Sequence, residues 1–188
     1  ASQLAMGSAA DAVAISQIFA NTNMAAAAGV VTAYLLSLVL GGGKANLAYC
    51  LNGALAGLVS ITAEPLTPTI MEAIAIGAVG AVIATFGAKL LEAVRIDDVV
   101  GAIPVHLFAG IWGTMAVPIT NSDATFFGQA VGVGAIGAFV FGTSFVVWLI
   151  LKITLGVRLS PDAEVVGGDL SELGAPAGSI FATPEGKA

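Results

Sequence analysis

Residues 125–155 read TFFGQAVGVGAIGAFVFGTSFVVWLILKITL, and the only charged residue among them is Lys152, close to the end. A helix needs about 20 consecutive apolar residues to cross the hydrocarbon core of a bilayer. Glycine weakens helices in water, but it is common in membrane helices, where it lets two backbones approach closely. This stretch therefore predicts a membrane-spanning helix, with the Lys152 ammonium group reaching back to the interface.

The rest of the chain has the same apolar character. Of the 188 residues, 57% are hydrophobic and only 10% are charged, whereas about 25% are charged in soluble domains. A soluble chain of this length exposes too much surface to hide so many apolar residues. We therefore predict an all-α integral membrane protein with about five spans, at residues 11–40, 45–62, 69–94, 99–117 and 125–155.

Glycines and prolines separate the predicted spans. Residues 41–43 are all glycine, which is a strong signal for the end of a helix, and Pro65 and Pro68 follow the second span. Pro118 is expected to end the fourth span. Residues 1–157 are thus predicted to form the transmembrane region, and residues 158–188, which are polar and contain glycine and proline, an extended tail.

The basic residues predict the orientation. If the five spans alternate, the first loop, the third loop and the tail share one face, and every Lys and Arg belongs to it: Lys44, Lys89, Arg95, Lys152, Arg158 and Lys187. The opposite loops, AEPLTP and ITNSDATF, contain no Lys or Arg. Because cytoplasmic loops carry the excess of these residues, we expect a cytoplasmic tail on a multi-pass protein of the plasma (inner) membrane.

Several functional classes are disfavoured by the composition. The net charge is −6 without a basic stripe, so we expect no nucleic-acid partner. Cys50 is the only cysteine and lies in an apolar run, which favours a buried, inert thiol. No metal-ligand spacing, Ser/His/Asp set or phosphate-binding glycine loop occurs, so we expect neither an enzyme nor a metal or cofactor. The opening ASQLAMGSAADA lacks a signal-peptide pattern and suggests a piece of a longer protein.

His106 is the most informative polar residue. It is the only histidine in the chain and lies near the middle of the fourth predicted span, between apolar neighbours. A neutral imidazole at bilayer depth needs a hydrogen-bond partner, so His106 is either satisfied within the packing or functional. Pro104 would loosen the same helix, either as a structural break or to aim the histidine at a lumen.

Other polar and small residues are given structural roles. Asp97 and Asp98 are expected to cap the fourth helix. Hydrogen bonding between helices is expected for the amides and the hydroxyl inside the first two spans, at Asn21, Thr22, Asn23 and Asn52. Helix packing is expected for two pairs of glycines at four-residue spacing, Gly53 with Gly57 and Gly128 with Gly132.

Four segments, in order along successive spans, resemble the family of ammonium transporters (Amt/Rh/methylammonium permeases). NTNMAAAAG at residues 21–29 is similar to the family's N-T-x-x-A-A-A-A segment, and GGGKANLAYCLNGALAGLVSITAEP at 41–65 resembles its G-K-P to T-P stretch. RIDDVVGAIPVHLFAGIWGTM at 95–115 resembles the D-D to V-H-x-x-x-G-I-x-G segment, and GVRLSPDAEVVGGDLSELG at 156–174 resembles the tail. The resemblance covers nearly the whole chain.

The resemblance implies a fold of eleven transmembrane helices, in which this chain supplies the last five and the N-terminal half supplies the others. It also implies a homotrimer with one pore in each subunit. His106 then matches the second of two pore histidines, and Ser2 matches a serine that helps to hold the cation at the outer mouth. Ile103 and Leu107 flank His106 and are candidate walls of the lumen. A PII-type regulator would bind the tail, where this sequence departs from the family pattern at Leu173 and Ala175.

The function that this resemblance implies is transport of ammonium, ammonia or methylammonium through an apolar pore. A second departure, Gly101 in place of a frequent acidic residue, keeps an alternative open, namely an ammonium sensor whose membrane domain is coupled to a signalling module. A third hypothesis is an unrelated channel or structural membrane subunit. The sequence following Ala188 would separate the first two, and a second histidine in preceding helices would argue against the third.

Overall fold

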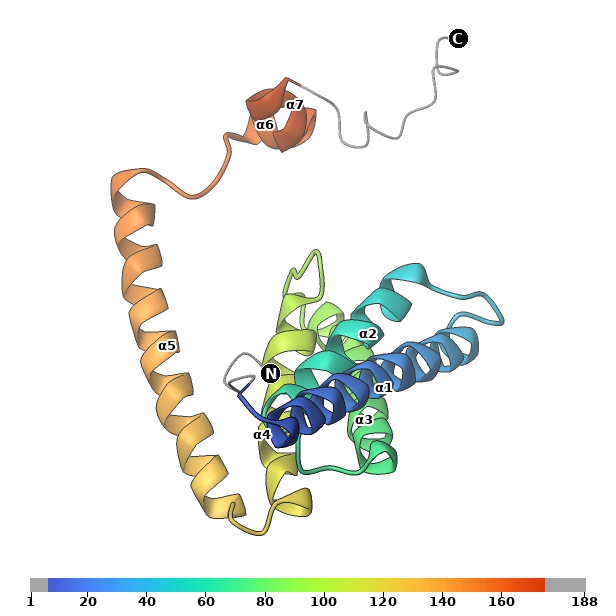
Figure 1. Ribbon diagram of the computed structural model, residues 1–188. Coiled ribbons are helices and arrows are strands. Elements are labelled where there is room, and N and C mark those ends of the chain that lie inside the picture. The colour runs from blue at the N-terminus through green and yellow to red at the C-terminus, as the bar shows by residue number, and fades with distance from the viewer. Residues whose placement is uncertain (1–6, 175–188) are drawn as a thin grey trace. The chain divides into compact units, whose positions relative to one another are not determined.

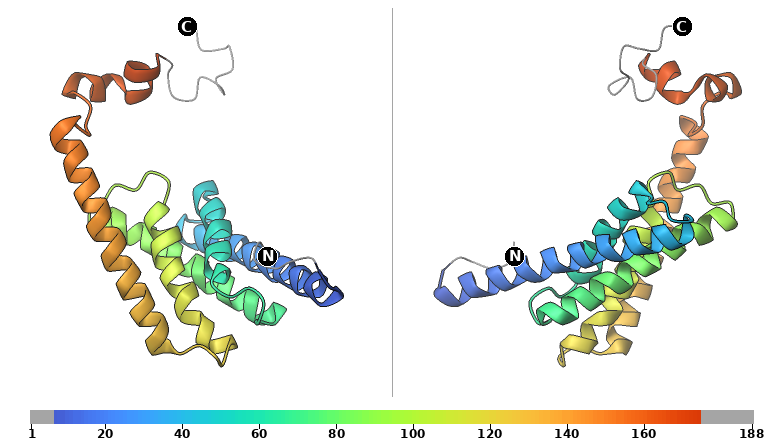
Figure 2. Two further views of the ribbon diagram at one scale, coloured as in Figure 1. Left: turned by 60° about the vertical axis from the view of Figure 1, so that its left-hand side comes forward. Right: turned by 90° about the vertical axis from the view of Figure 1, so that its right-hand side faces the viewer.

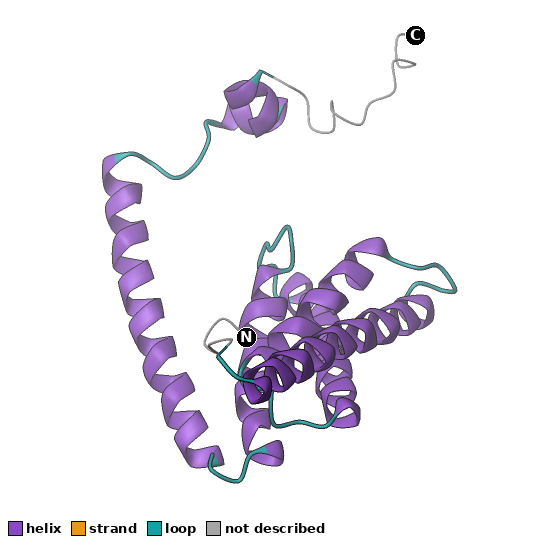
Figure 3. Cartoon of the chain, viewed as in Figure 1, coloured by secondary structure: helices purple, strands orange, loops and turns teal. Residues whose placement is uncertain are grey.

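The computed structural model describes residues 7–174, which contain helices and loops but no strand (Figure 3). In chain order the helices are α1 (Ala9–Leu40), α2 (Leu47–Thr62), α3 (Ile70–Ala93), η1 (Ile103–Phe108), α4 (Ala109–Thr120), α5 (Phe126–Thr154), α6 (Pro161–Val166) and α7 (Gly168–Leu173). The chain divides into two compact units, Ala1–Ile136 and Gly137–Ala188. The first unit holds α1 to α4, and most of α5 with α6 and α7 belongs to the second.

The predicted all-α membrane architecture is confirmed. Four helical segments are long and apolar enough to cross a bilayer, Ala9–Leu40, Ile70–Ala93, Ile103–Thr120 and Phe126–Thr154. α2 is also apolar but has only 16 residues, which corresponds to about 24 Å of helix. It is therefore shorter than the hydrocarbon core of about 30 Å and lies among longer helices.

Local sequence signals set most of the helix ends. At the start of α1, the Ser8 hydroxyl accepts a hydrogen bond from the backbone N–H of Asp11 at 3.2 Å. α3 begins with a capping box, in which the Thr69 and Glu72 side chains each accept from the other residue's backbone N–H. α1 ends at the three glycines, two of which have φ of +61° and +90°, a region where a side chain would be strained.

In the first unit, α1, α2 and α3 pack against one another and α4 packs against α2 and α3 (Figures 1 and 2). Glycines permit the close approach. A Cβ atom at Gly57 would lie 2.3 Å from the backbone oxygen of Ala25, and one at Gly77 would lie equally close to it. A Cβ at Gly53 would lie 2.4 Å from that of Ala33. The predicted packing role of Gly53 and Gly57 is thereby confirmed.

The other glycine pair behaves differently. A Cβ at Gly132 would meet nothing within 4 Å, and one at Gly128 would meet only the hydroxyl of Thr125, three residues earlier, at 3.0 Å. The helix-packing role predicted for this pair is thus not found among the described residues. Among the described residues, α5 contributes no buried side chain.

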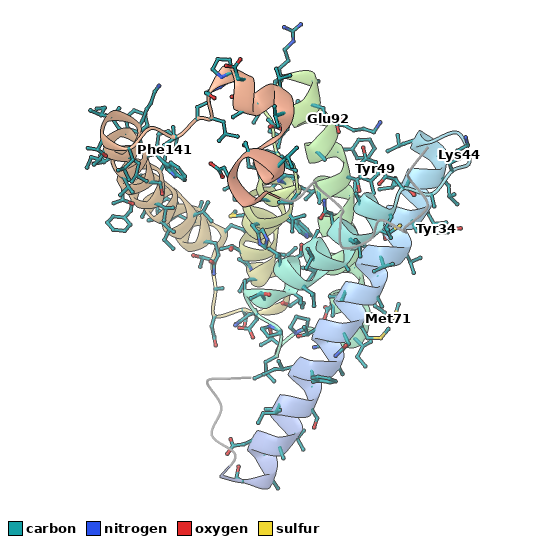
Figure 4. The ribbon with its side chains drawn as sticks, turned by 90° about the horizontal axis from the view of Figure 1, so that it is seen from above. Tyr34, Lys44, Tyr49, Met71, Glu92 and Phe141 are labelled. Atoms are coloured by element: carbon teal, nitrogen blue, oxygen red, sulfur yellow. The ribbon has the colours of Figure 1, made fainter. Side chains whose placement is uncertain are left out.

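Two hydrogen bonds show how the loops of the first unit are distributed. The Asn52 side chain, near the start of α2, donates to the backbone oxygen of Val100 in the loop before η1, at 3.1 Å. Tyr49 and Glu92 lie at this same end (Figure 4). Near the opposite ends of α2 and α4, the Asn121 amide donates to the Glu64 carboxylate at 3.2 Å. The first and third loops are therefore at one end of the unit, and the second and fourth at the other.

Three details differ from the sequence-based expectations. α4 continues through Pro118 to Thr120, because a proline so close to a helix end disrupts few backbone hydrogen bonds. Cys50 is half-buried and not fully buried, since it lies near the exposed start of α2. Residues 158–174 are not simply extended, because they contain α6 and α7, and Ser160 caps α6 by accepting from the N–H of Ala163 at 3.3 Å.

An ion pair links the segment after α5 to α6. The Arg158 guanidinium donates twice to the Glu164 carboxylate, and its second hydrogen bond, from Nη2, measures 3.0 Å. These hydrogen bonds lower the pKa of Glu164 below the usual carboxyl value. Both side chains are solvent-exposed, so the pair organises this short segment and contributes little to overall stability.

Candidate functional site

His106 lies in η1, a π-helical turn that opens the fourth span. The turn covers Ile103–Phe108, and its wide register is seen where the N–H of Ala109 donates to the oxygen of Pro104, five residues earlier. Turns of this kind are rare in helices and are found frequently at functional sites. His106 is thus near the beginning of the span Ile103–Thr120, and not near its middle as the sequence suggested.

Asp98 shapes the start of this span. One oxygen of its carboxylate accepts from the N–H of Ala102, and the other accepts from the N–H of Ile103, each at 2.8 Å. These amides belong to the first helical turn, which has no carbonyl partners of its own. The predicted capping role is therefore confirmed for Asp98, whereas Asp97 is exposed at the adjacent position.

One face of η1 packs against α2 and α3. Pro104 is fully buried and Val105 is 1% exposed. Val105 and Ala109 form a cluster with Ala56 of α2 and Ala84 of α3. A Cβ at Gly87 of α3 would lie 2.6 Å from the Phe108 ring, so a glycine is needed there for η1 to pack this closely.

The opposite face of η1 is not packed by any part of residues 7–174. His106 is exposed, Leu107 is 52% exposed and Ile103 is half-buried. Ile111, one turn further along in α4, is 39% exposed. We call these four residues the open face. Within residues 7–174 nothing donates to or accepts from the imidazole of His106.

The structure therefore brings three of the four predicted site residues onto one surface, namely Ile103, His106 and Leu107. The fourth, Ser2, lies outside the described residues. Away from the open face, α4 packs closely against α3 and α2, as two observations show. The Trp112 indole donates to the oxygen of Ile76 at 3.0 Å, and a Cβ at Gly113 would lie 2.4 Å from the oxygen of Ser60.

A cavity of about 170 Å³ lies beside the start of η1, at the end of the unit that holds the third loop. It is lined by Ala88, Leu91, Glu92, Ile96, Asp97, Asp98, Gly101 and Pro104. The open-face residues do not line it, because Pro104 faces the cavity from the packed side of η1. The cavity is therefore separate from the surface that carries His106.

Comparison with known proteins identifies the family. The sequence model described as Ammonium Transporter Family matches residues 1–177. The chain belongs to this family. It is 39% identical to the ammonium transporter Amt2 of Archaeoglobus fulgidus over 191 residues, covering 91% of this chain and 41% of that protein. It is 32% identical to an ammonium transporter of Bacillus subtilis over 169 residues, with coverages of 81% and 42%.

A solved structure of the same kind matches the fold. The crystal structure of Candida albicans Mep2 superimposes with a TM-score of 0.70 at 27% identity, covering 90% of this chain and 42% of that one. The chain thus spans about two fifths of the length of the relatives that it matches. The ammonium transporter fold is therefore present here in part, as a set of helices with an unpacked face at His106.

The side-chain amides have partners that the sequence did not predict. Asn21 is fully buried and donates to the oxygens of Pro65 and Pro68 in the loop after α2, at 2.9 and 2.7 Å. Asn52 donates to Val100 in another loop, and Asn23 donates to the oxygen of Phe19 in its own helix at 2.8 Å. The expectation of helix-to-helix bonds was therefore wrong for these three residues. Backbone carbonyl groups in proline-containing loops have no partner in a helix, so the loops after α2 and before η1 could have been recognised as acceptors for these amides.

Proposed function

We propose that the protein containing this chain transports ammonium across the membrane, and that the open face of η1 and α4 lines the pore. The observation that carries the proposal is the placement of His106, which is exposed on an otherwise apolar surface while its neighbours Pro104 and Val105 are buried. An unpaired imidazole at a membrane-embedded surface is costly unless it faces a lumen or a partner. The family and the names of the relatives support ammonium as the substrate.

The physical basis is desolvation. An ammonium ion moved bare into a medium of low dielectric constant costs on the order of 20 kcal/mol. Neutral ammonia avoids most of this cost, so an apolar passage walled by Ile103 and Leu107 would favour it. Potassium cannot lose a proton and would be rejected. The imidazole of His106 would hydrogen-bond the neutral species or relay its proton, because each ring nitrogen can donate or accept. Ser2 would act earlier, at the outer mouth.

The remaining parts of this proposal concern the assembled protein. The N-terminal half would cover the open face and complete the pore, and three copies would form a homotrimer in the plasma (inner) membrane. The tail would be cytoplasmic and available to a PII-type regulator. The distribution of loops supports this orientation, because Lys44 and Arg95 lie in the first and third loops, at one end of the first unit, and Glu64 and Asp123 lie in the second and fourth, at the other.

We expect cells that produce the full-length protein to take up labelled methylammonium, and we expect ammonium but not potassium to compete. The reason is that only the protonated nitrogen compounds can shed a proton before entering the apolar passage. The measurement is initial uptake rate at increasing concentrations of each competitor, with cells lacking the protein as the control. Competition by potassium equal to that by ammonium would contradict an apolar, deprotonating pore.

We also expect a cytoplasmic tail. A protease site inserted after Ala188 should be resistant to protease added outside intact cells and should be cleaved after the cells are opened, because basic residues favour the cytoplasmic side. The matched control is the same site inserted after Ser122, in the opposite loop, which should be cleaved from outside. Cleavage of the tail site in intact cells would reverse the orientation.

A further inference from the structure

The backbone before η1 contains a carbonyl group that its own helix cannot satisfy. The first backbone hydrogen bond of the helical segment is accepted by Gly101, from the N–H of Val105 at 3.2 Å, so the oxygen of Val100, one residue earlier, lies outside the helix. The side-chain amide of Asn52 donates to this oxygen at 3.1 Å from a different helix, α2. Asn52 therefore ties the turn before η1 to α2.

The geometry around this hydrogen bond leaves little room for another arrangement. Gly101 follows Val100 and has φ of +76°, a conformation that favours glycine. A Cβ at Gly101 would lie 2.3 Å from the Asn52 amide nitrogen, so a side chain there would displace the donor. The next two amides donate to the Asp98 carboxylate. At this helix start, Asn52 thus donates to one backbone oxygen that has no helical partner, and Asp98 accepts from two backbone N–H groups that have none.

The π turn that follows is the segment that carries His106. Its buried side is anchored by Pro104 and Val105, and its first residues are held by Asn52 and Asp98. A π turn contains one residue more than the corresponding α turn, and one residue is worth about 100° of rotation about the helix axis. Loss of the wide turn would therefore rotate His106 about the helix axis relative to Ile111 of α4, and so move it out of the open face.

We propose that Asn52 is a positioning residue that holds the π turn and thereby aims His106 into the pore. This inference rests on the proposed role of His106 in transport. Asn52 acts through the Val100 carbonyl and does not contact substrate. Its effect should therefore be seen in the maximal transport rate and in the local protection of backbone amides, with little change in the KM for methylammonium.

The first test compares Asn52→Leu with Asn23→Leu in the full-length protein. Leucine has nearly the shape of asparagine but no donor, and Asn23 donates only to its own helix. We expect Asn52→Leu to lower the maximal uptake rate about tenfold or more, because small misplacements of a functional group have effects of this size, and Asn23→Leu to leave it within about twofold. Equal effects of the two substitutions on uptake would overturn the proposal.

The second test uses hydrogen–deuterium exchange of the backbone amides of residues 102–109. Asn52→Leu should speed their exchange about fivefold to tenfold, since one supporting hydrogen bond is lost. Asn23→Leu, which removes a hydrogen bond within α1 and none near η1, should change the same exchange by less than about twofold. An equal acceleration in the two variants would show that exchange at residues 102–109 does not depend on the Val100 hydrogen bond and would reject the inference.

The two proposals fail in different ways. If His106→Ala leaves uptake unchanged while Asn52→Leu, but not Asn23→Leu, speeds exchange at residues 102–109, the pore role of His106 is lost and the role of Asn52 in holding the π turn is upheld. If His106→Ala abolishes uptake but Asn52→Leu alters neither uptake nor exchange, the pore role stands and the positioning role of Asn52 is rejected.

Discussion

Substitution of His106 by alanine is expected to lower methylammonium uptake by about tenfold to a hundredfold, or to change the charge that accompanies each transported molecule. A hydrogen bond that involves a charged or proton-exchanging group contributes about 1.5–3 kcal/mol, which corresponds to rate or affinity changes of this size. His106 is the only titratable residue of the open face, so no other residue of this face can take over the role.

The same substitution should leave folding unchanged. His106 is exposed and its ring has no hydrogen-bond partner within residues 7–174, so alanine removes no packing contact that α1 to α4 depend on. The amount of protein in the membrane and its thermal unfolding in detergent should therefore match the unsubstituted protein. Unaltered uptake together with unaltered current in reconstituted vesicles would remove His106 from the mechanism.

Gly57→Ala is expected to destabilise the first unit. The added Cβ would lie 2.3 Å from the backbone oxygen of Ala25 and 2.9 Å from its carbonyl carbon. Backbone atoms cannot turn aside as a side chain can, so α1 and α2 must separate. Overpacking of this kind lowers the free energy of unfolding by about 1–3 kcal/mol, and the altered angle between the helices should also lower uptake.

Gly110→Ala is the matched control for this prediction. A Cβ at Gly110 of α4 would approach the Val59 side chain at 3.6 Å, an ordinary contact distance. Alanine also favours helix over glycine by up to about 1 kcal/mol. Thermal unfolding of the detergent-solubilised protein should therefore fall for Gly57→Ala and stay equal or rise for Gly110→Ala. Equal stability of the two variants would mean that α1 and α2 do not approach as closely as the structure shows.

Local patterns in the sequence predicted the helices well because they depend on nearby residues. Apolar runs of sufficient length, Ser8 and Thr69 at helix starts, and the glycines after Leu40 each act within a few residues of themselves. The position of His106 within its span was missed. The helix start depends on the left-handed conformation of Gly101 and on the Asp98 carboxylate, and these two signals together outweigh the apolar character of residues 99 and 100.

Contacts between distant residues could not be predicted in the same way. Two glycine pairs have the same four-residue spacing, yet a Cβ at Gly53 or Gly57 would collide with α1, while one at Gly132 would meet no atom of the described residues within 4 Å. Likewise, three asparagines within apolar spans look alike in the sequence, but Asn21 and Asn52 bind loops and Asn23 binds its own helix. The spacing of small residues shows that another helix could approach closely. Which helix or loop does so depends on how the chain folds.

The amino-acid sequence alone determined that this protein lies in a membrane and that it contains long apolar helices, because hydropathy is a property of single segments. It also singled out His106 as a candidate site residue, because the cost of burying an imidazole depends on the segment that carries it. Only the tertiary structure decided which face of that segment is packed and which side chain satisfies the carbonyl of Val100. Both features depend on residues that are far apart in the chain, such as Asn52 and Val100, which are separated by 48 positions. Such residues come into contact because of how the helices pack, and the local sequence around each residue does not specify its distant partner.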